Sequence, residues 1–115
     1  MKNRYLYRYT TKGEGVWSAG KRLLPQYLVE EVLKNKKWLP KPNLPKGKYH
    51  FYLTEKGKEK YESTLLLSHK KYLPKIRKEK IDKKTVKNII YQDEWQIVEN
   101  MSAKVLLQNK LLILT

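Results

Sequence analysis

Two apolar runs flank a compact acidic step in the stretch Lys87-Asn88-Ile89-Ile90-Tyr91-Gln92-Asp93-Glu94-Trp95-Gln96-Ile97-Val98. The β-branched residues on both sides favour strands, so the acidic step predicts a connection between two strands. In one interpretation the connection is a tight turn whose acids, Asp93 and Glu94, are solvated. In the other, a carboxylate is held by its neighbours in a cleft, where a developing positive charge would be strongly stabilised.

Further strands are predicted on both sides of this stretch. Tyrosines alternate with other residues along positions 5–10, a period of two that is typical of a strand, and residues 49–53 have the same character. In the last part of the chain we expect strands at residues 89–92, 94–98, 105–108 and 111–114, with a turn at Asn109-Lys110 between the last two.

Helical spacing appears in two places. Apolar residues recur every three or four positions over residues 22–35, and Pro25 suits the first turn of such a helix. Thr54 is placed to cap a second helix that begins at Glu55 and is stopped by Pro74. The sequence therefore predicts a single α+β domain over residues 1–115, a small twisted pair of antiparallel-rich β-sheets with one or two packed helices.

Two segments predict irregular backbone. Residues 11–20 hold three glycines, which permit positive φ, so this segment is expected to be the most mobile internal loop. Residues 38–47 hold three prolines, which exclude regular structure and favour an extended connector.

The charge of the chain is strongly unbalanced. It carries 26 Lys and Arg against 11 Asp and Glu, a formal net charge of +15 over 115 residues. Self-repulsion of this size disfavours a compact state, so we expect a polyanionic partner, and nucleic acid fits best. No apolar run approaches the ~20 residues of a membrane span, and no basic start precedes an apolar signal core. We therefore expect an intracellular, cytoplasmic protein with no membrane partner.

Three short motifs occur in an order that resembles the ADP-ribosyltransferase superfamily. They are Leu6-Tyr7-Arg8-Tyr9-Thr10 in the first strand, Phe51-Tyr52-Leu53-Thr54-Glu55 where the middle strand meets its helix, and Gln92-Asp93-Glu94 where a late strand begins. The last step is also similar to that of a small branch of phage-encoded members, which includes an anti-CRISPR type. The resemblance extends over nearly the whole chain and implies a reduced ADP-ribosyltransferase-like fold.

This resemblance implies a role for each matched residue. Arg8 would contact bound NAD, Thr54 or Tyr52 would support the nicotinamide side, Glu94 would stabilise the ribosyl cation, and Gln92 would lie near the acceptor. Such an enzyme would use NAD to modify a nucleic acid or a nucleic-acid-associated protein. Cleavage of the bond to nicotinamide passes through an oxocarbenium-like transition state, so one well-placed carboxylate has a large effect.

Two of these residues also have simpler interpretations. Arg8 could be a strand charge that discourages pairing between sheet edges. Thr54 could be a plain helix cap.

A competing hypothesis is a non-enzymatic nucleic-acid-binding protein, or a phage-type inhibitor that docks on a nucleic-acid-handling complex. Lysines beside aromatic rings combine charge for phosphates with faces on which bases stack, although such lysines could also form a solvated face. The candidate residues are Lys34, Lys36, Lys37, Trp38 and Lys41, followed by Lys70, Lys71, Arg77 and Lys78 in the basic run 70–84. An enzyme predicts a cleft lined by Arg8 and Glu94, whereas a binding protein predicts a continuous basic surface from which Glu94 points away.

Other chemistry has little support in the sequence. The chain has no cysteine, which excludes disulfides, thiol nucleophiles and thiolate metal ligands. Neither His50 nor His69 has a carboxylate at helical i, i+4 spacing, so no metal site is predicted. Gly13-Glu14-Gly15 is not followed by the Lys-Ser or Lys-Thr of a phosphate-cradling loop.

Overall fold

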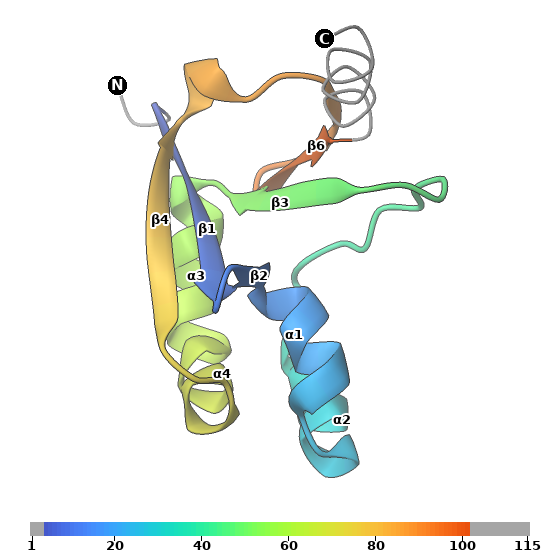
Figure 1. Ribbon diagram of the computed structural model, residues 1–115, viewed down its shortest axis with the longest axis vertical. Helices are drawn as coiled ribbons and strands as arrows, with labels where there is room; N and C mark the ends of the chain where they lie inside the picture. The colour runs from blue at the N-terminus through green and yellow to red at the C-terminus, as the bar shows by residue number, and fades with distance from the viewer. Residues whose placement is uncertain (1–3, 102–115) are drawn as a thin grey trace, which may run out of the picture.

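Residues 4–101 are described by the computed structural model, which Figure 1 shows as a ribbon. Strand β1 (Tyr5–Thr11) pairs antiparallel with β4 (Ile76–Asp82) along its whole length, with β2 (Glu14–Gly15) at its end, and with β3 (Tyr49–Leu53) at the single register pair Tyr7 and Leu53. β3 then pairs with β6 (Gln96–Asn100), and β6 pairs with β5 (Ile89–Gln92). The six strands form one curled antiparallel sheet.

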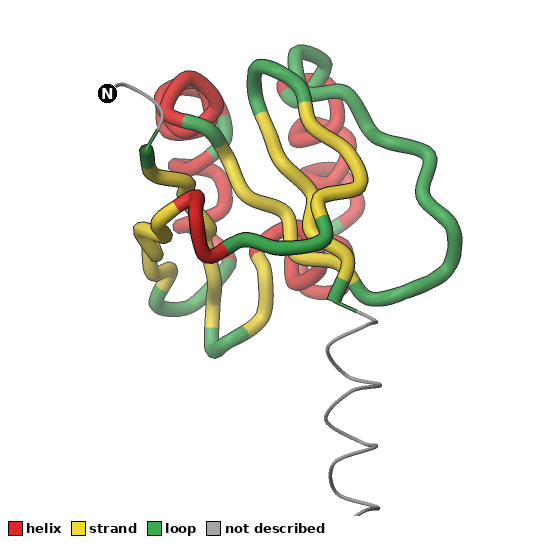
Figure 2. Tube along the Cα trace, turned by 90° about the horizontal axis from the view of Figure 1, so that it is seen from above, coloured by secondary structure: helices red, strands yellow, loops and turns green. Residues whose placement is uncertain are grey.

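The helices come in two consecutive pairs. α1 (Val16–Leu23) and α2 (Gln26–Asn35) follow β2, while α3 (Glu55–Thr64) and α4 (Leu66–Tyr72) follow β3. A short 3-10 helix, Lys83–Thr85, joins β4 to the second half of the sheet. Figure 2 shows the long connection between α2 and β3 as a green segment that arches away from the strands. The predicted α+β class is confirmed.

The sheet is covered on both faces. On the helix side, a core of buried residues includes Tyr7, Tyr9 and Leu53 of the strands together with residues of α1, α2 and α3 and Leu73, and the partly buried Leu66 of α4 packs against it. On the other side, a smaller core joins Leu6, Tyr52, Val86 and Ile97. Tyrosine suits these positions because its ring packs in the core while its hydroxyl finds a partner: the hydroxyl of Tyr7 donates to Glu55 and that of Tyr9 donates to Glu62.

The irregular backbone predicted for residues 11–20 is corrected, because most of this segment is regular structure. β1 continues to Thr11, and Lys12 and Gly13 form a two-residue turn with φ values of 49° and 82°. Positive φ at both central residues is what a tight hairpin needs. α1 then begins at Val16, so glycines that predicted a loop instead serve a hairpin and a helix start.

The predicted helix over residues 22–35 is also corrected. The backbone is extended at Leu24 and Pro25, so residues 22 and 23 belong to the end of α1. The predicted helix is confirmed over α2, which begins after Pro25 rather than holding it in its first turn. The helix that begins at Glu55 breaks at Leu65, so residues 4–101 hold four α-helices rather than one or two.

Two further corrections concern strands. The expected pair of sheets is a single sheet, and the basic run 70–84 contains β4, a strand whose Arg77, Lys78, Glu79 and Lys80 are exposed. Charged residues on both faces hide the period of two that identifies a half-buried strand. The predicted strands at 105–108 and 111–114, with the turn between them, lie outside the described residues. Within residues 4–101 no helix is both long and apolar enough to cross a membrane.

Candidate anion-binding pocket

A pocket of about 280 Å³ opens between β3, the start of α1 and the connection that follows α2. It forms where β1 and β3 part, because these strands share only the register pair at Tyr7 and Leu53 before β1 turns toward β2. The residues that line it are Tyr7, Arg8, Tyr9, Gly15, Val16, Trp17, Ser18, Lys21, Lys36, Leu39, Pro40, Lys41, Pro42, Tyr49, Phe51, Leu53 and Gln96.

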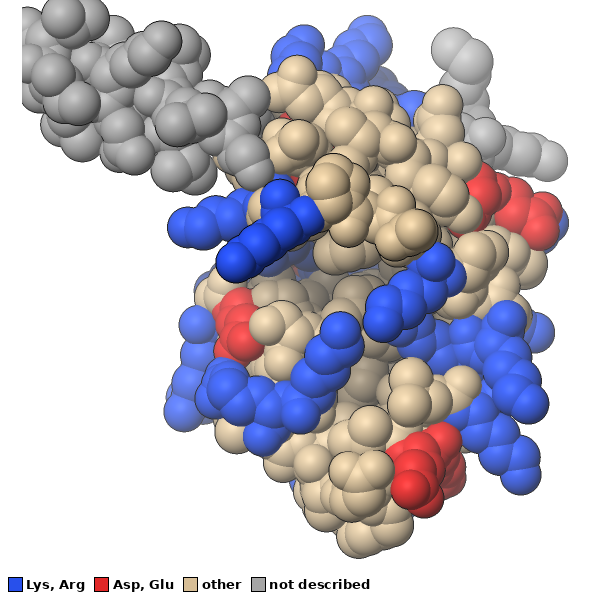
Figure 3. Space-filling view, turned by 90° about the vertical axis from the view of Figure 1, so that its right-hand side faces the viewer, with Lys and Arg blue, Asp and Glu red and all other residues tan. Residues whose placement is uncertain are grey.

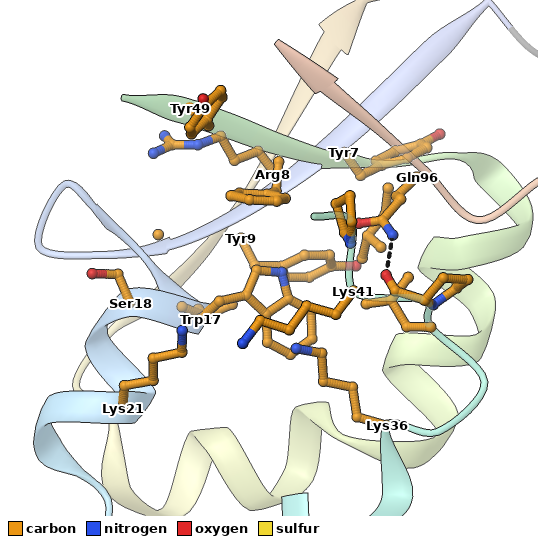
Figure 4. A pocket seen from close by; sticks show the side chains of 17 residues that line it. Tyr7, Arg8, Tyr9, Trp17, Ser18, Lys21, Lys36, Lys41, Tyr49 and Gln96 are labelled. Carbon is orange, nitrogen blue, oxygen red and sulfur yellow. Dashed lines mark hydrogen bonds between the residues drawn. The ribbon is translucent and has the colours of Figure 1, made fainter. Parts of the chain in front are cut away.

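Aromatic rings form much of the wall (Figure 4). Tyr49 and Phe51 extend from β3, and Trp17 extends from the first turn of α1. Core residues contact the Trp17 ring, which makes edge contacts with the rings of Tyr61 at 5.4 Å and His69 at 5.6 Å between ring centres. The indole is therefore fixed in orientation by the core.

Three lysines reach the pocket from different segments. Lys21 comes from α1, Lys36 follows α2, and Lys41 lies on the connection, and Figure 4 shows their amino groups around the Trp17 ring. The Lys36 amino group lies over that ring, 4.8 Å from its centre. Burial lowers the pKa of Lys36, and the charges of Lys21 and Lys41 lower it further. These three lysines are named the lysine cluster below.

Arg8 adds a fourth cation from β1. Its side chain is 16% exposed, and its guanidinium lies 3.9 Å from the carboxylate of Glu79 on β4. No acidic side chain is among the described residues that line the pocket. Figure 3 shows one face of the molecule, on which Lys and Arg side chains gather around a hollow. The pocket therefore favours a negatively charged ligand.

Hydrogen bonds hold the rim in place. The side-chain amide of Gln96 donates to the carbonyl of Pro40 at 2.6 Å, which fastens the connection to β6. The hydroxyl of Tyr49 donates to the carbonyl of Pro45, further along the same connection. A segment without regular structure is thus held against the sheet at two points.

Behind the pocket lies a buried polar pair, Tyr61 and His69. The hydroxyl oxygen of Tyr61 and Nδ1 of His69 are 2.7 Å apart. Burial lowers the pKa of His69 to about 4, with a smaller contribution from the charge of Lys36, and burial raises the pKa of Tyr61. Both groups are therefore neutral at pH 7 and support the packing of Trp17.

The residues matched to the ADP-ribosyltransferase motifs do not all come together. Arg8 lines the pocket, whereas Thr54, Tyr52, Gln92 and Glu94 are not among its lining residues. Thr54 caps α3, because its hydroxyl accepts from the N–H of Gly57 at 3.1 Å, and it also donates to the backbone carbonyl of Glu94 at 2.6 Å. Thr54 and Glu94 are therefore neighbours.

Glu94, Gln92 and Tyr52 have other surroundings. The Glu94 carboxylate forms an exposed ion pair with Lys56 at 2.8 Å. Gln92 is exposed at the end of β5. Tyr52 is buried on the opposite face of the sheet, where its hydroxyl donates to Glu99 at 2.8 Å.

Of the two acidic residues between β5 and β6, Asp93 is the one that stabilises the connection. Its carboxylate accepts hydrogen bonds from the N–H of Trp95 at 2.7 Å, the N–H of Gln96 at 2.9 Å and the hydroxyl of Tyr91 at 2.7 Å. Burial would raise the pKa of Asp93, but these hydrogen bonds outweigh it and the pKa is lowered. The carboxylate is held at the connection between β5 and β6.

The candidate nucleic-acid-binding residues divide into two groups. Lys36 lines the pocket, and the neighbouring Lys34 and Lys37 are exposed. Trp38 does not line it; its ring packs against Trp95 at 5.3 Å, and its indole N–H is buried without a partner among the described residues. The second group consists of Lys70 and Lys71 on α4 and Arg77 and Lys78 on β4, all exposed and outside the pocket.

Sequence reasoning missed Trp17 and Lys21 as site residues. Trp17 lies in the segment 11–20 that predicted a loop, and Lys21 directly follows it. They meet Lys36 and Lys41 only because the chain returns to α1 after α2. An aromatic residue and a lysine four positions apart on one helix were the available signal.

Comparisons with protein-family models, curated proteins and solved structures find no match for this chain. The fold and the pocket therefore stand on their own geometry.

Proposed function

We propose that this protein is a nucleic-acid-binding protein without enzymatic activity, and that its contact surface is centred on the pocket. One observation carries the proposal: four cationic side chains, Arg8, Lys21, Lys36 and Lys41, surround an aromatic pocket that has no acidic residue in its described lining. Phosphates would bind the cations, and bases would bind the rings.

Electrostatic interactions support the proposal both within the pocket and over the whole chain. Within the pocket, the like charges of the lysine cluster repel one another, and a phosphate among them would relieve that repulsion. Across the whole chain, a net charge of +15 would attract a polyanion and accelerate its association. Lys34 and Lys37 extend the charge from the pocket along the end of α2.

Modification of a macromolecule with NAD stays a prediction from the sequence. Thr54 and Glu94 lie together, but the described pocket that Arg8 lines does not include Glu94. The binding hypothesis therefore has the stronger geometric support. A protein that docks on a nucleic-acid-handling complex would use the same charge against a different acidic surface.

Fluorescence anisotropy with a labelled oligonucleotide tests the proposal. The variant K21Q/K36Q/K41Q removes the lysine cluster and should bind at least about tenfold more weakly, since each lost phosphate contact weakens binding. The affinity of the wild-type protein should fall linearly on a log–log plot as salt increases, with a slope of about −0.7 for each phosphate neutralised on a single strand.

The matched control removes the same charge elsewhere. K70Q/K71Q/R77Q takes three exposed cations from α4 and β4, outside the pocket. We expect this variant to weaken binding less than the pocket variant does. An equal loss of affinity in the two variants would show that only total charge matters. An affinity that does not change with salt concentration would rule out the proposal.

A further inference from the structure

The pocket has room for a ligand of about the size of one nucleotide. A volume of about 280 Å³ lies just below the roughly 300–1,000 Å³ of typical small-molecule sites. A base within a duplex is paired and stacked, and it reaches an enclosed site only after leaving the stack. Only an unpaired nucleotide could therefore place its base in this pocket.

The walls present flat apolar surfaces. Rings of Trp17, Tyr49 and Phe51 approach from α1 and β3, and Pro40 and Pro42 complete the wall from the connection. Every base has a π-face, so stacking on such rings does not depend on base identity.

The cations lie at the same pocket as the rings. The lysine cluster converges from three segments, and Lys36 lies directly over the Trp17 ring, 4.8 Å from its centre. A nucleotide has the matching arrangement, an apolar base joined to a phosphate. Inorganic phosphate would engage only the lysines, and an uncharged base would engage only the rings.

Several polar groups of the lining already donate within the protein. The hydroxyl of Ser18 donates to Glu14 at 2.8 Å, that of Tyr49 donates to Pro45, and the side-chain amide of Gln96 donates to Pro40. Reading a base requires donors and acceptors aimed at its edge. These three neutral donors are engaged within the protein and are not aimed at a base edge, so they favour no particular base.

We infer that the pocket captures one unpaired nucleotide of a nucleic-acid strand, with its base against the rings and its phosphate among Lys21, Lys36 and Lys41, and with little preference between bases. This inference rests on the proposed function and adds to it a selection for single strands over duplexes.

Competition experiments test the inference on the full chain. Labelled single-stranded oligo(dT) is bound to the protein and then displaced with an unlabelled single strand, with a blunt duplex of equal phosphate content, with thymidine monophosphate or with inorganic phosphate. The single strand should compete about tenfold better than the duplex. Thymidine monophosphate should displace the probe at concentrations where inorganic phosphate does not, and adenosine and cytidine monophosphates should match it within a few fold.

A ring variant provides a second readout. Tyr49→Leu keeps an apolar strand residue but removes a ring from the wall, so the advantage of single strand over duplex should shrink several fold. Tyr27→Leu is the matched control, since Tyr27 is exposed on α2 outside the pocket, and it should retain that advantage. Circular dichroism verifies that both variants are folded.

The outcomes separate the inference from the proposed function. Salt-dependent binding with equal affinity for single strand and duplex would overturn the inference and leave the proposed function intact. Equal competition by phosphate and nucleotide would also overturn it, because the base would then contribute nothing. No binding of any oligonucleotide would remove both.

Discussion

His69 is a titratable side chain that the fold holds in its neutral form. Its pKa is lowered from 6.5 to about 4 by burial and, less strongly, by Lys36. Between these pH values the unfolded chain binds a proton that the folded protein does not. The contribution of neutral His69 to the free energy of unfolding is therefore fully present above pH 6.5 and is lost as the pH falls toward 4. The total loss should be roughly 3 kcal/mol. Urea denaturation at about pH 7 and about pH 5 measures most of it.

The variant His69→Asn isolates this effect. Asparagine keeps a polar group near the hydroxyl of Tyr61 but does not titrate, while carboxylates with lowered pKa, such as Glu55 and Glu62, are common to both proteins. The wild-type protein should lose more stability than the variant over this pH interval. Equal losses would contradict a buried neutral histidine.

Glu94 separates the enzyme hypothesis from the binding hypothesis. If Glu94 stabilises a ribosyl cation, Glu94→Gln should lower nicotinamide release from NAD by roughly a hundredfold with little effect on folding, because the charge is lost and the shape is kept. Arg8→Ala should instead weaken NAD binding. The assay uses cell extract as a source of acceptors.

In a binding protein, the same substitution has a different result. Glu94→Gln should leave oligonucleotide affinity unchanged or slightly improved, because it removes a charge that repels phosphate. Nicotinamide release by the wild-type protein that disappears in Glu94→Gln would contradict the binding hypothesis and favour the enzyme.

The connection between β5 and β6 depends on Asp93 rather than on its acidic neighbour. Asp93→Ala leaves the N–H groups of Trp95 and Gln96 and the hydroxyl of Tyr91 without their acceptor, so it should cost about 1–3 kcal/mol of unfolding free energy. Glu94→Ala, the matched control, removes an exposed ion pair worth less than ~1 kcal/mol. Chemical denaturation compares them, and equal destabilisation would contradict this assignment.

The start of α3 packs unusually closely against the same connection. A Cβ built on Gly57 would lie 2.0 Å from the carbonyl oxygen of Trp95, a backbone atom that cannot move aside alone. Gly57→Ala should therefore destabilise the protein by roughly 1–3 kcal/mol or more, although alanine favours helices. Glu59→Ala, at an exposed position of α3, is the control, and thermal denaturation is the measurement. A stabilised Gly57→Ala would show that α3 and the connection do not pack this closely.

Strand periodicity predicts part of the sheet well. The period of two predicts strands at 49–53 and 89–92, and the structure confirms both ranges. β4 escapes prediction because Ile76 and Ile81 are its only isoleucines and the residues between them are charged. The turn at Lys12 and Gly13 escapes because glycines near a helix start resemble a loop in sequence.

The pocket is harder to predict than the strands. Sequence reasoning identifies Lys36 and Lys41 from a local pattern of lysines beside an aromatic residue, and Arg8 from the resemblance to the ADP-ribosyltransferase motifs. It cannot place them beside Trp17 and Lys21, because that proximity arises from the return of the chain to α1 and from the parting of β1 and β3. A tertiary arrangement of this kind has no local signal in a single sequence.

At the scale of the whole molecule, cations and aromatic rings meet at the pocket, and the tryptophans distinguish the pocket from its surroundings. Trp17 lines the pocket, whereas Trp38 and Trp95 pack against each other and do not line it. Fluorine NMR of protein labelled with fluorotryptophan, titrated with single-stranded oligo(dT), therefore tests whether this pocket is the nucleic-acid site. We predict that the Trp17 resonance shifts most, and that the shift is lost in K21Q/K36Q/K41Q. A saturating oligonucleotide that leaves Trp17 unchanged while Trp38 or Trp95 shifts would contradict a nucleic-acid site at this pocket.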